Sequence, residues 1–127
     1  MNLAYADTSV LVAIAFAEPG HEELATRVEG FDRVISSNLL EAEFRSALVR
    51  EGVPPQSAGL LNWLGWVFPE RALSAEYQQV LAHGYVRGAD LWHLACALYL
   101  RSKLGQLSFL TLDERQRELA GELGMAG

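Results

Sequence analysis

Short apolar runs alternate with longer amphipathic stretches along the whole chain. A short apolar run that ends at turn residues predicts a buried strand, whereas apolar positions repeated every three or four residues predict a helix. On this basis the expected strands are Leu3–Ala6, Arg33–Ser36 and Leu107–Leu112, and Val67–Leu73 is expected to be extended. The expected helices are Val10–Ala17, His21–Glu29, Leu39–Arg50, Gln56–Trp66, Ala75–His83, Asp90–Lys103 and Glu114–Leu123.

This alternation of strands and helices is typical of an α/β fold with a mostly parallel sheet and helices on both of its faces. The 127 residues suffice for one domain, and no linker, repeat or low-complexity tract divides them. We therefore expect a single domain over residues 1–127. In such folds ligands bind at the carboxyl ends of the strands, so the residues that follow each strand are the first candidates for a site.

Two aspartates stand where predicted strands end. Asp7 directly follows the first strand and precedes Thr8, Ser9 and a helix, and Asp113 directly follows the last strand. Because the carboxyl ends of parallel strands meet at one edge of a sheet, these two side chains are expected to lie close together. Each of them also fits the N-cap of the helix that follows, so either residue alone has an equally good structural explanation.

Glu43 lies in the helix predicted after the second strand. At about 100° per residue, Leu40 and Phe44 mark the buried face of this helix, and Glu43 borders that face. Glu41 points roughly the opposite way and has Arg45 as its i,i+4 partner, in the favourable order. Glu41 is therefore expected to form a solvated ion pair, whereas Glu43 is pressed toward the core. A carboxylate there is costly unless it is paired or binds a metal. The competing explanation is a glutamate at the helix edge that reaches solvent.

Asp90 opens the predicted helix Asp90–Lys103, which is apolar almost all round and therefore central. A helix N-cap is again the simplest alternative. His93 follows one turn later, and we interpret it as a packing or supporting residue rather than a metal ligand.

The joint placement of the four acids carries more weight than any one of them. Carboxylates that converge at one edge would repel one another without cations, and hard cations such as Mg²⁺ or Mn²⁺ prefer oxygen ligands. No cysteine and histidine spacing suggests zinc. The sequence therefore predicts a magnesium or manganese site formed by Asp7, Glu43, Asp90 and Asp113.

Composition and charge limit the setting of this site. The net charge of −6 and the pI of about 5.0 argue against a wholly basic surface for nucleic acid, although a local basic rim can still hold a phosphate backbone. The candidates for that rim, each close in sequence to one of the acids, are Arg45, Arg50, Arg87, Arg115 and Arg117. Cys96 is the only cysteine, no secretory signal is recognisable, and no apolar run approaches the roughly 20 residues of a membrane span. A cytoplasmic protein without a membrane partner is expected.

Four segments together resemble the PIN-domain nucleases, and most of all the VapC-type toxins of toxin–antitoxin pairs. They are Ala6–Leu11, Ser36–Leu39 leading to Glu43, Gly88–Ala95 and Leu110–Asp113. The resemblance covers essentially the whole chain. It implies a three-layer α/β/α sandwich, a homodimer, Mg²⁺ or Mn²⁺, endonucleolytic cleavage of RNA and a separately encoded antitoxin protein.

The resemblance also implies roles for single residues. Asp7, Glu43, Asp90 and Asp113 become the catalytic, metal-binding acids. Thr8, Ser9 and Thr111 become helpers that orient these acids or a bound water. Independently of the resemblance, we expect Arg45, Arg87 and Arg115 of the basic rim to bind substrate, together with Thr8, Ser9 and Thr111. Two positions depart from the family. Arg115–Arg117 stand where many relatives have a further acid, which argues against a full second metal site. Trp92 stands where relatives usually have a small residue.

Other functions fit the residues less well. A phosphate-accepting receiver domain would have adjacent acids after its first strand, and a dehalogenase-type phosphatase would have Asp-x-Asp, but Asp7 is followed by Thr8 and Ser9. The alternative that stays open is a catalytically silent PIN-like module that binds RNA or a protein partner. The aromatic segment Leu60–Phe68 is a candidate dimer contact, a cap on the core or a groove for an antitoxin.

Overall fold

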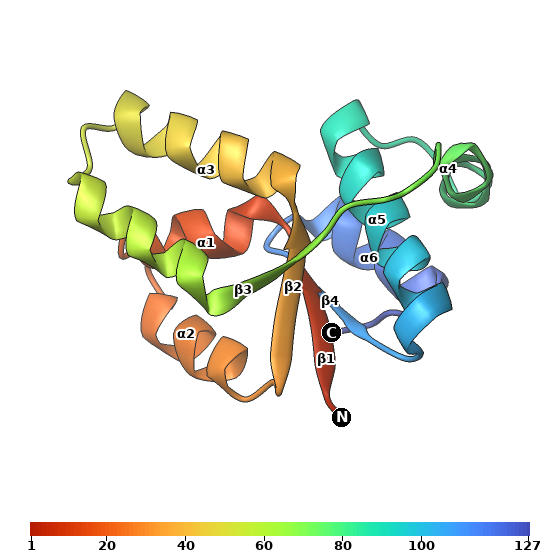
Figure 1. Cartoon of the computed structure of the whole chain (residues 1–127), viewed down its shortest axis with the longest axis horizontal. Coiled ribbons are helices and arrows are strands. Elements are labelled where there is room, and N and C mark those ends of the chain that lie inside the picture. The colour runs from red at the N-terminus through yellow and green to blue at the C-terminus, as the bar shows by residue number, and fades with distance from the viewer.

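Four parallel strands form one sheet at the centre of the molecule (Figure 1). The computed structural model describes residues 1–127. The strands are β1 (Leu3–Ala6), β2 (Arg33–Ser37), β3 (Leu64–Val67) and β4 (Ser108–Leu110), and their order across the sheet is β3-β2-β1-β4. Every neighbouring pair is parallel, as the alternation of strands and helices predicted.

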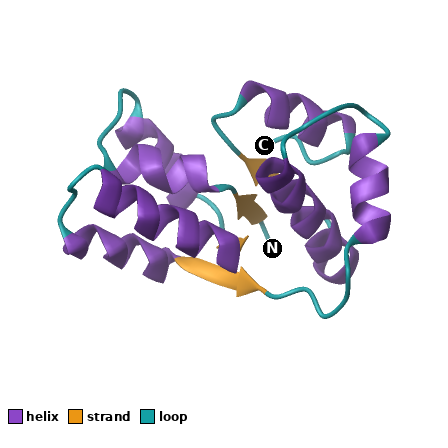
Figure 2. Ribbon diagram, turned by 90° about the horizontal axis from the view of Figure 1, so that it is seen from above, coloured by secondary structure: helices purple, strands orange, loops and turns teal.

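Helices cover both faces of the sheet. On one side lie α1 (Thr8–Ala15), α2 (His21–Glu29), α3 (Asn38–Arg50) and the 3₁₀-helix η1 (Pro55–Trp63). On the other side lie α4 (Ser74–Leu81), α5 (Gly88–Leu104) and α6 (Glu114–Glu122), as Figures 1 and 2 show. This arrangement confirms the predicted three-layer α/β/α sandwich. None of the helices combines the length and the apolar character that crossing a membrane requires.

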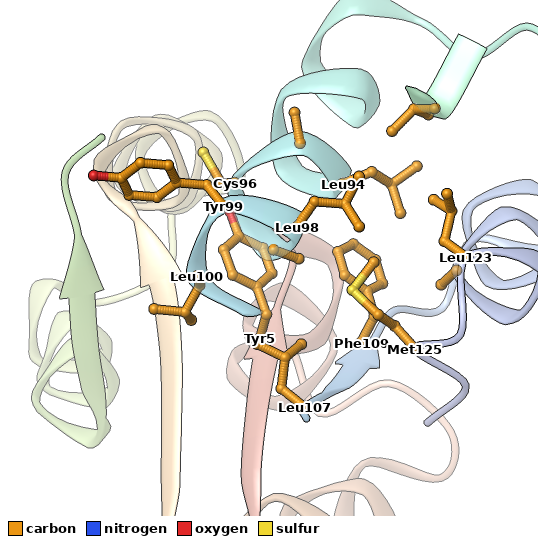
Figure 3. Packing of buried hydrophobic residues seen from close by; sticks show 14 of the residues in the cluster. Tyr5, Leu94, Cys96, Leu98, Tyr99, Leu100, Leu107, Phe109, Leu123 and Met125 are labelled. Carbon is orange, nitrogen blue, oxygen red and sulfur yellow. The ribbon is translucent and has the colours of Figure 1, made fainter. Parts of the chain in front are cut away.

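The alternation of side chains along β1 divides the core into two parts. Leu3 and Tyr5 point to the layer of α4, α5 and α6, whereas Ala4 and Ala6 point to the layer of α1 and α3. Figure 3 shows the first part, in which Tyr5 stacks on Phe109 of β4 beneath α5. β1 is buried on both faces, and it therefore supplies a rigid support for the residues that follow it.

The structure corrects the sequence reading around the third strand. The predicted helix Gln56–Trp66 is a 3₁₀-helix that ends at Trp63, and the strand is Leu64–Val67 rather than an extended Val67–Leu73. The pairing with β2, from Val34 opposite Leu64 to Ser37 opposite Val67, determines this boundary. The apolar run around it has no clear period, so the sequence did not reveal where the helix ends.

The direction of the chain connections changes between β1 and β4. The chain passes from β1 to β2 and β3 on one side, then crosses back to β4 on the other side of β1. The connections leave β1 and β4 in opposite directions at their carboxyl ends, which is where ligands bind in open parallel sheets. Asp7 follows β1 at this point, and its backbone N–H donates to the Leu110 carbonyl at 3.1 Å.

The packing of α3 yields a test of the fold. Phe44 is fully buried, whereas Val49 on the same helix is 83% exposed. Phe44→Ala should lower the free energy of unfolding by about 3–5 kcal/mol, because it leaves a cavity in the core. Val49→Ala should change it by less than about 0.5 kcal/mol. Urea unfolding of the two variants measures both values, and similar losses would mean that this helix does not pack as described.

Candidate active site

Asp7 occupies the first position after β1 and caps α1. It is 4% exposed, and its Oδ1 accepts from the Ser9 backbone N–H at 3.1 Å and from the Ser9 hydroxyl at 2.6 Å. Its Oδ2 accepts from the Thr111 hydroxyl at 2.8 Å. Burial raises the pKa of Asp7 above its usual value, and the bonds from Ser9 and Thr111 oppose that rise. Asp7 therefore caps α1 and also belongs to the candidate site.

Glu43 points to the same region from α3. Its Oε1 accepts from the Thr8 hydroxyl at 2.6 Å and lies 3.2 Å from Nε2 of His93. The His93 bond is the largest of the effects that lower the pKa of Glu43, ahead of the opposing effect of burial. Both contacts end on the same oxygen, so Oε2 is the atom of Glu43 that can meet a ligand.

A buried tyrosine determines how His93 meets Glu43. The Tyr5 hydroxyl lies 2.7 Å from Nδ1 of His93, and both side chains are almost completely buried. Burial strongly raises the pKa of Tyr5, so the phenol keeps its proton. A Tyr5 hydroxyl that donates to Nδ1 places the His93 proton on Nε2, which then donates to Glu43. The histidine is therefore a supporting residue, which is how the sequence was interpreted.

Asp90 lies in the first turn of α5 and is the least hydrogen-bonded of the four acids. Arg87 is its closest cation, with Nε 3.7 Å from Oδ2. Burial raises the pKa of Asp90, and repulsion from Asp113 raises it further. Glu43 adds a smaller effect in the same direction. The acids therefore act on one another electrostatically although they come from different elements.

Asp113 caps α6, and its Oδ1 accepts from the Gln116 backbone N–H at 2.8 Å. The backbone N–H of Asp113 donates to the Thr111 hydroxyl at 3.0 Å, which in turn bonds Asp7. Gln116 is completely buried and reaches the Asp90 carbonyl at 3.3 Å. Thr111 and Gln116 thus tie the first turns of α5 and α6 to the end of β1.

The arginines of the expected rim divide into two groups. Arg45 pairs with Glu41 at 2.8 Å, as its position on the helix predicted, and this pair lies away from Glu43. Arg50 pairs with Glu51 at the far end of α3, and Arg117 donates to the Thr111 carbonyl at 3.0 Å. Only Arg87 and Arg115 line a cavity together with acids of the site.

That cavity measures about 310 Å³ and opens beside the N-terminus of α5. It is lined by Tyr85, Val86, Arg87, Asp90, Asp113 and Arg115. The sequence pattern did not single out Tyr85 or Tyr5, and it offered Gln116 only as the capping-box partner of Asp113. No motif marks the two tyrosines, because Tyr85 lies in a loop and Tyr5 has the pattern of an ordinary core residue in a buried strand.

The donor set fits a hard divalent cation by its chemistry. All four candidate ligands are carboxylates. The pKa values of Asp7 and Asp90 are raised, and a nearby cation would lower them by stabilising the ionised carboxylates. In the arrangement observed, no three His, Cys, Asp or Glu side chains are grouped closely enough to hold one metal ion. Asp7, Glu43 and Asp113 are each held by protein donors instead, so binding a metal requires side-chain rotation.

Comparisons with known proteins agree with this geometry. The family model of the PIN domain matches residues 4–122, a range that includes all four acids. Ribonuclease VapC46 of Mycobacterium tuberculosis (strain ATCC 25618 / H37Rv) is 32% identical to the chain over 128 residues. The alignment covers 99% of this chain and 96% of that relative. The likeness therefore extends over the whole sandwich rather than over one motif.

The charge on Asp90 yields a prediction about stability. Because the pKa of Asp90 is raised in the folded state, folding favours the protonated acid. Protonated Asp90 therefore stabilises the folded state at low pH, and this stabilisation is lost as the pH rises through the folded-state pKa. In a chelating buffer at pH 7, Asp90→Asn should therefore melt at a higher temperature than the wild type. The difference should shrink as the pH falls toward about 4, the usual aspartate pKa. Glu18→Gln, which removes one charge from an exposed site, is the matched control. A lower melting temperature for Asp90→Asn at pH 7 would contradict the assignment.

Proposed function

The chain belongs to the PIN-domain family, and we propose that it is a metal-dependent endoribonuclease that hydrolyses RNA phosphodiester bonds. This proposal is supported by the position of the four acids near the carboxyl ends of β1 and β4, where Asp113 and Glu43 repel Asp90 and Asp90 repels Asp7. The name of the M. tuberculosis relative, a ribonuclease, supports the same activity. A helix-capping role alone would not account for the repulsion between acids that, after burial, helps to raise the pKa values of Asp7 and Asp90.

We infer that Mg²⁺ or Mn²⁺ is the cofactor and that these four acids would hold it. When bound, such an ion supplies a Lewis acid for the phosphoryl group. The protein's own contribution is to orient the acids. Ser9 and Thr111 hold both oxygens of Asp7, whereas Thr8 and His93 hold one oxygen of Glu43 and leave the other free.

The cavity beside Asp90 supplies the substrate contacts in this proposal. Arg87 is 78% exposed and Arg115 is 44% exposed, and both guanidinium groups flank Asp90 and Asp113. Two cations next to the acids would hold the RNA backbone on either side of the reacting phosphate. Thr8, Ser9 and Thr111 act through the acids that they hydrogen-bond. Arg45 is assigned no direct contact, because it pairs with Glu41 on the outer surface.

We also propose that the chain is the toxin of a toxin–antitoxin pair, since its relative carries the name of a VapC protein. The partner would then be a separately encoded antitoxin that covers the groove of the acids. Co-expression with the product of a short neighbouring reading frame should yield a complex that lacks the cleavage activity of the isolated chain. A fully active complex would argue against this regulatory role.

The two neighbouring glutamates of α3 provide the test of the activity. Glu43→Gln should lower the rate of cleavage by at least about tenfold, because it removes the charge that the site uses. Glu41→Gln removes the same charge from the outer face and should leave cleavage intact, at a cost of about 0.2–0.5 kcal/mol in stability. The measurement is cleavage of labelled RNA with Mn²⁺ or Mg²⁺, and a chelator should abolish it.

Cleavage that survives Glu43→Gln or the chelator would contradict the proposed site. If the wild type binds RNA but never cleaves it, the alternative of a silent RNA-binding module replaces the proposal.

Self-association is a separate proposal that rests on an exposed apolar surface. Trp63 is 42% exposed and Phe68 is 62% exposed, and a largely apolar cavity of about 630 Å³ adjoins Phe68, Trp66 and Leu104. Together with the unpaired outer edge of β3, this surface fits a second copy of the chain.

Light scattering should therefore report a dimer for the wild type, and Phe68→Glu should shift it toward the monomer without changing the circular-dichroism spectrum. Trp63→Ala tests the other end of the same surface, and Val49→Glu is the control on an exposed apolar residue elsewhere. A monomeric wild type at micromolar concentration would exclude the dimer. A dimer that resists both substitutions would place the interface on another face.

A further inference from the structure

Tyr85 is a large aromatic residue that the fold leaves in solvent beside the acids. Its side chain is 76% exposed, although it lines the same cavity as Asp90 and Asp113. The apolar ring of a tyrosine is normally placed where it can be covered, and an exposed one next to a reactive site is typical of a binding surface. Tyr85 forms no part of either hydrophobic core and makes no side-chain hydrogen bond that would explain its position.

The loop that carries Tyr85 is held in place on three sides. Val86, the next residue, is 6% exposed and packs into the core beneath α5. The Arg115 guanidinium donates from Nε to the Tyr85 carbonyl at 3.3 Å. Gly84 has a φ of 139°, and a Cβ at this position would collide with the same guanidinium. The backbone of Tyr85 is therefore fixed before any ligand arrives, which lowers the entropy that binding costs.

The charges around Tyr85 indicate the kind of ligand. Arg87 and Arg115 line the same cavity as Tyr85, in a protein whose net charge is −6. An exposed aromatic ring in one cavity with two arginines suits a nucleotide, since the base can stack on the ring while the phosphates meet the arginines.

We propose that Tyr85 is the residue that stacks an unpaired base of the RNA next to the phosphate that is cleaved. This inference rests on the proposed function and adds to it. A base paired in a duplex presents only its edges, so the ring requires a base that is out of a helix. The substrate would therefore be single-stranded at this position, and preference would follow stacking strength, with purines held better than pyrimidines.

The test is equilibrium binding of labelled RNA to the full-length chain in a chelating, low-salt buffer, in which the RNA stays intact. The probes are short oligomers of adenylate and of uridylate, an RNA duplex, and a ribose–phosphate oligomer without bases. Tyr85→Leu keeps an apolar side chain but loses the ring, and Tyr85→Phe keeps the ring but loses the hydroxyl. Both changes are on an exposed side chain, and circular dichroism checks that the variants fold.

Tyr85→Leu should weaken binding of the adenylate oligomer by about 5- to 150-fold, the range that loss of one stacked base produces. The loss should be smaller for the uridylate oligomer and absent for the duplex and the oligomer without bases. Tyr85→Phe should bind all four probes as the wild type does. Equal weakening with every probe would overturn the proposal, because it would reveal a role in phosphate binding or loop structure. An unchanged adenylate complex would also overturn it, and would assign Tyr85 to a protein interface.

The two proposals can fail separately. Cleavage of RNA by the wild type, measured with metal, tests the nuclease function and does not involve Tyr85. A chain that never cleaves RNA but shows the stacking pattern would refute the nuclease and keep the base-binding residue. A chain that cleaves RNA and binds it equally well without the ring would refute the stacking proposal alone.

Discussion

The cost of keeping several carboxylates at one edge of a buried sheet is the constraint on which the rest of this structure depends. Asp7 and Asp90 both lose water on folding, and both lie in range of further acids, so their pKa values rise. An uncompensated buried charge would destabilise a domain of this size severely. The fold meets that cost with hydrogen bonds, because each acid except Asp90 accepts from protein donors.

Those donors come from elements that lie far apart in the sequence, and they bind the two halves of the sandwich together. Thr111 after β4 holds Asp7 after β1, and Thr8 on α1 holds Glu43 on α3. His93 of α5 crosses from the opposite layer to reach Glu43, and it is itself held by Tyr5 of β1. The polar site is thus continuous with the two apolar cores and takes its rigidity from them.

Contacts between distant elements also hold the cavity beside Asp90 in place. The first turns of α5 and α6 meet there because Gln116, buried between them, reaches the Asp90 carbonyl. Arg115 of α6 then fixes the loop before α5, through Gly84 and the Tyr85 carbonyl. The helix α6 is therefore capped by one acid, supports a second one through Gln116 and holds the backbone of Tyr85 through Arg115. This arrangement places two arginines beside the acids in a chain whose net charge is −6.

The sequence by itself determined the order of the elements and the parallel sheet, and it singled out the four acids as candidates. Each of these depends on local periodicity or on position relative to a strand end, as with Asp7 and the phase that separates Glu43 from Glu41. Only the tertiary structure decided the boundary at Leu64, because pairing with β2 and not any local period ends the preceding 3₁₀-helix. It also decided which arginines face the site, and it brought in Tyr5, Gln116 and Tyr85. These residues reach the acids through contacts between elements distant in sequence, and a linear pattern carries no information about such contacts.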